Sequence, residues 1–97
     1  MIIVWGAVEA KAGHLQEVVR LSLEHVHRSR KEPGCIRHSV QIDVEEPNSL
    51  VFYEEWEDMA ALQTHFQVPE SGQFIAALTD LVNGEPEMKI YEATPAQ

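Results

Sequence analysis

The sequence has one cysteine, few basic residues and no long apolar run. The single cysteine, Cys35, excludes an internal disulfide and is typical of a reducing compartment. Seven Lys and Arg against 16 Asp and Glu give a net charge of −9, and such an acidic surface repels nucleic-acid phosphates. No apolar run approaches the ~20 residues of a membrane span, and the first ten residues lack a signal peptide's basic region. We therefore expect a cytoplasmic protein without nucleic-acid or membrane partners.

What is present has the composition of one small folded domain. The 97 residues are 44% hydrophobic and 24% charged, which is typical of a globular chain. A chain this short supports one core, so residues 1–97 are predicted to form a single domain. A domain of this size can bury more surface by forming oligomers.

Four segments are predicted to be strands. Residues 2–10 are rich in Val, Ile and Trp, and residues 36–44 alternate between two faces with period two. A turn at 45–49 leads into 50–56, which completes a hairpin, and 87–93 form the last strand. One face of the second strand carries Ile36, His38, Val40, Ile42 and Val44.

Two helical regions lie between these strands. The first begins after 11–13 and ends before Pro33. The second is capped by Asp58, is interrupted at Pro69, and then continues to a stop at 83–84. The expected apolar positions are Leu15, Val18, Val19, Ser22 and Val26 in the first region, Met59, Leu62 and Phe66 in the second, and Phe74, Ile75, Leu78, Leu81 and Val82 in its continuation.

The resulting β-α-β-β-α-β order predicts an α+β, ferredoxin-like fold, with helices on one face of a four-stranded antiparallel sheet. The first strand, however, is apolar on both faces, and 50–56 do not alternate cleanly between apolar and polar residues. Monomers rarely expose apolar patches of that size. We therefore expect a homodimer in which two such sheets pack face to face.

The segment EPGCIRHSVQIDVEEPNSLVFYEEWEDMAALQTHF, residues 32–66, resembles the antibiotic biosynthesis monooxygenase superfamily. That group includes quinol monooxygenases, and its relatives include haem-degrading enzymes and an autoinducer-2 isomerase. The likeness covers nearly the whole chain and is most specific in the EPGC turn and in YEEWED…AL…H. It implies a dimeric α+β barrel with a pocket between helices and sheet in each subunit. It also implies oxygenation of phenolic or quinol substrates without metal or flavin.

The sequence departs from that pattern in two places. Many relatives continue after the helical His with TPHF or TPHY, whereas this chain has VPESGQF. Glu70 thus stands where a second His often lies, and the aromatic residue is displaced to Phe74. The first strand lacks the Asn of the haem-degrading branch, so haem degradation is not expected.

Oxygenation without a cofactor requires a base near an acidic hydroxyl and an apolar cavity that excludes water. His65 lies three residues after Leu62, at the edge of the stripe facing the sheet, and histidine titrates in the useful range. His38 is the one polar residue on its strand face. Each has a structural alternative, since His65 could bond a backbone carbonyl and His38 could be a hydrogen-bonded core residue.

Four aromatic residues complete the predicted site. Tyr53 could donate a hydrogen bond to a substrate oxygen, and Trp56 could provide a flat wall for an aromatic ring. Phe66 and Phe74 are expected to line the pocket. Packing in the core is the alternative for all four residues.

The sequence offers no obvious metal site. Glu54 and Glu55 point to opposite faces of a strand, and Asp58 is engaged as a cap. His25 and His27 are separated by roughly 200° around a helix, so they cannot share an ion. We expect no three convergent ligands, and neither metal nor another cofactor.

Three functions are compatible with this pattern. The first is a cofactor-independent monooxygenase in which His65, with His38, deprotonates a phenol or quinol and Tyr53 steadies the oxyanion. The second is an isomerase in which the same base abstracts a proton beside a carbonyl group. The third is a dimer without catalytic activity that binds a small hydrophobic metabolite or has a stress-related role.

Overall fold

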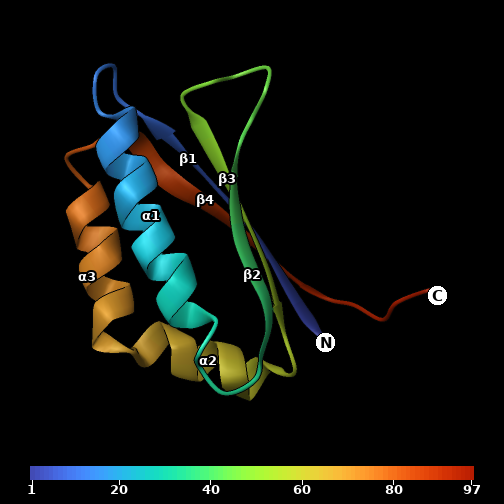
Figure 1. Ribbon diagram of the computed structural model, residues 1–97. Coiled ribbons are helices and arrows are strands. Elements are labelled where there is room, and N and C mark those ends of the chain that lie inside the picture. The colour runs from blue at the N-terminus through green and yellow to red at the C-terminus, as the bar shows by residue number, and fades with distance from the viewer.

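A four-stranded antiparallel sheet in the order β2-β3-β1-β4 is the base of the fold. The computed structural model describes residues 1–97. Three helices lie on one face of the sheet: α1 and α3 run side by side, and α2 crosses near their ends (Figure 1). The predicted α+β, ferredoxin-like arrangement is confirmed. The elements are β1 (Ile2–Ala10), α1 (Leu15–Ser29), β2 (Cys35–Ile42), β3 (Ser49–Trp56), α2 (Met59–Gln67), α3 (Pro69–Leu78) and β4 (Val82–Glu92).

Helix α1 and the turn after it follow the predicted pattern. The buried residues of α1 follow helical spacing, with gaps of one, three or four positions, so one face of the helix packs against the sheet. Gly34 ends the connection to β2 with a φ of +84°, which favours glycine. A Cβ atom on Gly34 would lie 2.5 Å from the Cβ of Ala61, so this turn holds α2 close. The buried residues are Val18, Ser22, His25, Val26 and Ser29.

Helix α2 begins as predicted but buries a different face. The Asp58 carboxylate accepts a hydrogen bond from the Ala61 amide over 2.8 Å, which confirms the cap. The expected stripe is wrong at both ends, because Met59 and Phe66 are 38 and 42% exposed. A short helix crossing the end of the layer buries only one narrow face, which here carries Leu62 and His65.

The second helical region divides into two helices and ends early. Pro69 occupies the first turn of α3, where its missing N–H costs no hydrogen bond. The stop expected at residues 83–84 is wrong, because α3 ends at Leu78 and Val82 already belongs to β4. Val82 pairs with Ala10 of β1, and this strand pairing takes precedence over the helical spacing.

The helices cover one face of the sheet and leave the other face partly exposed. Strand β3 alternates strictly, with its even-numbered residues buried beneath the helices and its odd-numbered ones half-buried on the far face. Strand β2 lies at the edge, and the apolar face expected there is buried only at His38 and partly at Val40. Ile36 and Ile42 are about half exposed, because the helices do not reach the ends of this edge strand. Val44 lies beyond the end of β2 and is exposed. None of the helices is long and apolar enough to cross a membrane.

Candidate active site

A cavity of about 100 Å³ lies between the helices and the sheet. Its walls come from α1, α2 and α3 on one side and from β1, β3 and β4 on the other. A cavity of ~150 Å³ holds benzene, and this one is smaller, so it offers room for at most one small ring. Its lining comprises apolar Val4, Gly6, Ala7, Val8, Phe52, Phe66, Phe74, Ile75, Leu78, Pro86 and Met88 together with polar His25, Glu54, His65, Ser71 and Glu87.

His65 enters this cavity from the last turn of α2 and is held by a carboxylate. Its Nδ1 lies 2.7 Å from Oε1 of Glu32, in the turn after α1. A carboxylate accepts hydrogen bonds, so Nδ1 carries the proton and donates it. The lone pair of the neutral ring is then on Nε2, which has no hydrogen-bond partner in the protein. His65 is therefore oriented as a base.

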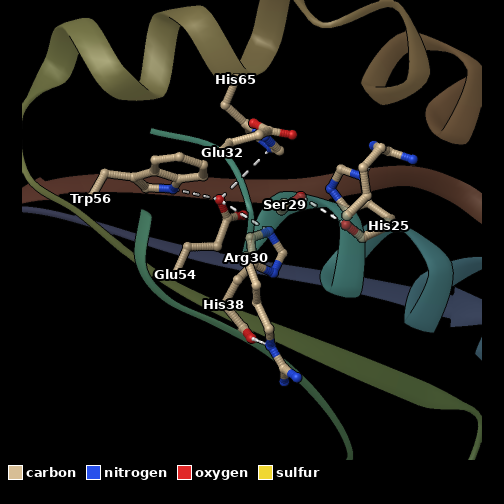
Figure 2. Close-up of polar contacts among 9 residues, drawn as sticks. His25, Ser29, Arg30, Glu32, His38, Glu54, Trp56 and His65 are labelled. Carbon is tan, nitrogen blue, oxygen red and sulfur yellow. Dashed lines mark hydrogen bonds and ion pairs between the residues drawn. The ribbon is translucent and has the colours of Figure 1, made fainter. Parts of the chain in front are cut away.

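Glu54 is the buried anion at the centre of the site (Figure 2). Its Oε1 accepts a hydrogen bond from Nε1 of Trp56 over 2.8 Å and lies 3.3 Å from Nε2 of His38. Burial by itself would raise the Glu54 pKa. The interactions with His38, Trp56 and His65 outweigh it, so the pKa is lowered from its ordinary value. Glu54 is thus ionised at neutral pH, and its Oε1 lies 4.0 Å from Nε2 of His65.

His38 lies behind Glu54 and does not line the cavity. The two residues face each other across the β2–β3 ladder, and the His38 ring meets Trp56 edge to face, with centroids 6.4 Å apart. The Arg30 guanidinium also donates to the His38 carbonyl over 2.9 Å. His38, predicted as a partner of the base, thus lies next to the site and contacts Glu54 from outside the cavity.

His25 is one of three site residues that were not predicted from the sequence, the others being Glu32 and Glu54. It lies on the buried face of α1, and its ring stacks on Phe74 with centroids 4.2 Å apart. Its Nδ1 is 2.6 Å from a terminal nitrogen of the Arg28 guanidinium. Burial, with the nearby charges of His38, His65 and Arg28, lowers the His25 pKa to about 3. The signal was available, since His25 follows Ser22 by three positions and precedes Val26 on the predicted stripe.

Three imidazoles converge here, contrary to the expectation that no three ligands would. One nitrogen from each of His25, His38 and His65 lies within 4.8 Å of the others. The rings come from α1, β2 and α2, so no local spacing in the sequence could indicate the cluster. These are the residues that could hold a metal ion. Zinc–nitrogen bonds of ~2.0–2.1 Å would bring the nitrogens to roughly 3.3 Å apart, and the Arg28 cation beside His25 opposes a second positive charge.

The four predicted aromatic residues divide between three places. Phe66 and Phe74 line the cavity, as expected. Trp56 lies entirely in the core with Leu62 and does not reach the cavity. The expected place of Tyr53 beside His65 is wrong: the strand alternation that turns Glu54 inward turns Tyr53 to the far face. There its hydroxyl donates to Glu55 over 2.5 Å.

Comparison with known proteins finds the same domain elsewhere. Residues 1–77 match the family described as antibiotic biosynthesis monooxygenase. The uncharacterised protein sll1783 of Synechocystis is 38% identical over 96 residues, and the alignment covers 99% of this chain but 65% of that longer protein. A candidate antibiotic biosynthesis monooxygenase from Deinococcus radiodurans is 31% identical with a TM-score of 0.95, over 100 and 96% of the two chains. A conserved Methanosarcina mazei protein is 28% identical, with a TM-score of 0.90 over 96 and 92%.

Proposed function

The chain belongs to the antibiotic biosynthesis monooxygenase family, and we propose that it is a cofactor-independent monooxygenase for a single-ring phenol or quinol. This proposal rests on the hydrogen bonding and the position of His65. Its Nδ1 is bound by Glu32, its Nε2 is free beside the Glu54 carboxylate, and its ring lines an apolar cavity.

The first step is removal of the phenolic proton. A hydroxyl that points to Nε2 of His65 transfers its proton there, and the imidazolium that forms lies between two carboxylates. Glu32 holds the ring in the required tautomer and Glu54 supplies negative charge near the new N–H. A buried carboxylate behind a catalytic histidine acts in the same way in hydrolases. The protonated His65 ring is therefore stabilised by a carboxylate on each side.

The second step is reaction of the phenolate with O₂. The electron-rich ring supplies electrons that the neutral phenol gives up far less readily. Oxygen adds to a ring carbon that carries hydrogen, the His65 imidazolium returns its proton to the peroxide, and loss of water from the hydroperoxide leaves a quinone. A phenol and O₂ thus give a quinone and water, and a hydroquinone and O₂ give a hydroxyquinone and water, so no external reductant is consumed. The apolar walls, including Phe52 and Phe74, exclude bulk water from the intermediate.

The same proposal includes a homodimer formed through the far face of the sheet. Trp5 and Tyr53 lie there with Ile3 and Tyr91, around a shallow surface depression that also includes Lys89. A second copy would bury these side chains, which one protomer leaves partly exposed. The single cysteine further supports a cytoplasmic location.

Oxygen uptake by metal-free protein tests the proposal. A panel of hydroquinones and monocyclic phenols should be consumed faster than their autoxidation by the wild type and by His27→Ala, which changes an exposed histidine on α1. His65→Ala should show only the background rate. Turnover that persists under strict anaerobiosis would instead indicate isomerisation.

A further inference from the structure

His25 and His65 line the same cavity but have partners of opposite charge. Nδ1 of His65 faces Glu32, which accepts hydrogen bonds, whereas Nδ1 of His25 faces Arg28, which only donates them. The neutral His25 ring must therefore carry its proton on Nε2. One ring presents a lone pair and the other presents an N–H, and the difference is set by Glu32 and Arg28.

The Nε2–H of His25 has no acceptor in the protein. It makes no hydrogen bond to another residue, and it is not among the sealed polar atoms of the interior. Because it is not sealed, this N–H keeps access to water through the cavity, and a ligand that displaces this water must supply an acceptor or leave the N–H unpaired. A ligand oxygen in the cavity would supply the missing acceptor.

The spacing of the two rings suits one oxygen atom. Their centroids are 5.2 Å apart, and one nitrogen of each lies within 4.8 Å of a nitrogen of the other. An oxygen with hydrogen bonds of about 2.8 Å to two nitrogens can bridge such a gap. A phenolic oxygen could thus give its proton to His65 while it accepts the N–H of His25.

We propose that His25 is a second catalytic residue, whose Nε2–H binds the substrate oxygen as it becomes an anion, and that Arg28 is a positioning residue that fixes this tautomer. The assignment rests on the proposed function and deepens it. Arg28 contributes positive charge from outside the cavity lining. His25 stays neutral, so it stabilises the oxyanion without competing for the proton that His65 removes.

The tautomers can be measured without turnover. In protein labelled with ¹⁵N at histidine, two-bond ¹H–¹⁵N couplings at pH 7 should show His25 as Nε2–H and His65 as Nδ1–H. Arg28→Gln should convert His25 to a mixture, because an amide both donates and accepts. Arg37→Gln, on an exposed side chain, is the matched control and should leave both rings unchanged. An Nδ1–H form of His25 in the wild type would overturn the assignment.

The donor role can be measured with 4-nitrophenol, whose phenolate absorbs at longer wavelength than the phenol. His25→Phe keeps an aromatic ring against Phe74 but removes the N–H. The ratio of ionised to neutral bound dye at pH 7 under argon should fall about tenfold in this variant, as expected for one hydrogen bond. An unchanged ratio, or no dye binding to the wild type, would overturn the proposal.

Turnover then separates this inference from the proposed function. With an oxidisable phenol, His25→Phe should lower kcat by roughly 10²–10³ and change KM much less, as does loss of an oxyanion donor. If no phenol is oxidised but the tautomer and dye results hold, the monooxygenase proposal fails and the donor assignment stands. If oxidation occurs with full kcat in His25→Phe, the donor assignment is wrong.

Discussion

The His65 imidazole donates from Nδ1 to the Glu32 carboxylate over 2.7 Å, joining the last turn of α2 to the turn that follows α1. The two residues are 33 positions apart in the chain. This contact leaves Nε2 of His65 free to accept a proton in the cavity.

Glu32→Gln should leave the ring in place but remove the charge that favours its protonated form. We expect kcat for phenol oxidation to fall by roughly 10²–10⁴, since a neutral partner can also select the wrong tautomer. Oxygen uptake compared with Glu46→Gln, which changes an exposed acid in the β2–β3 turn, measures the effect. Equal rates in the two variants would show that Glu32 does not support the base.

Trp56→Phe should destabilise the protein by about 2–4 kcal/mol, because it leaves a small cavity and removes a donor from the buried Glu54 carboxylate. Urea unfolding measures the loss. A double-mutant cycle with Glu54→Gln separates the two causes, since the hydrogen-bond part should couple to Glu54 and the cavity part should not. A coupling energy of zero would mean that the indole contributes only its volume.

Acid should destabilise the fold from about pH 6.5 downward. The His25 pKa is about 3 in the folded protein and ~6.5 in an unfolded chain, so the unfolded state binds more protons between these values. The free energy of unfolding therefore decreases as the pH is lowered below 6.5. His25 contributes up to ~1.4 kcal/mol of this decrease per pH unit. Glu54, whose pKa is also lowered on folding, contributes a loss of the same sign at lower pH.

Unfolding free energies between pH 7 and 4 test this linkage. His25→Phe should have a shallower slope than the wild type below pH 6.5, whereas His27→Ala should retain the wild-type slope. A wild-type slope in His25→Phe would place the acid sensitivity elsewhere.

Trp5→Glu should disrupt the proposed dimer, because it places a charge at the middle of the far face of the sheet. Light scattering after size exclusion should give a dimer mass for the wild type and a monomer mass for the variant. Leu23→Glu, on the exposed side of α1, should remain dimeric. A monomeric wild type would contradict the proposed assembly.

The sequence was most informative where the determinants are local. The cap at Asp58, the break at Pro69 and the placement of Glu54 and Glu55 on opposite faces of a strand all depend on neighbouring residues, and the structure confirms them. The end of α3 was predicted wrongly, because Val82 continues the helical spacing but pairs with β1 instead. Local preference is overridden there by a contact between distant segments.

The site was only partly predictable for the same reason. His65, Phe66 and Phe74, which line the cavity, were singled out from helical spacing and family likeness. Glu54 could have been placed in the site, since period two puts it on the buried face of β3. The contact between Glu32 and His65 has no local signature.

The most direct test is oxygen consumption by metal-free wild type and His65→Ala with single-ring hydroquinones. We expect oxygen uptake above the autoxidation rate in the wild type, with a hydroxyquinone as the product, and we expect both to be lost in His65→Ala but not in His27→Ala. Uptake that is unchanged in a folded His65→Ala protein would contradict this expectation.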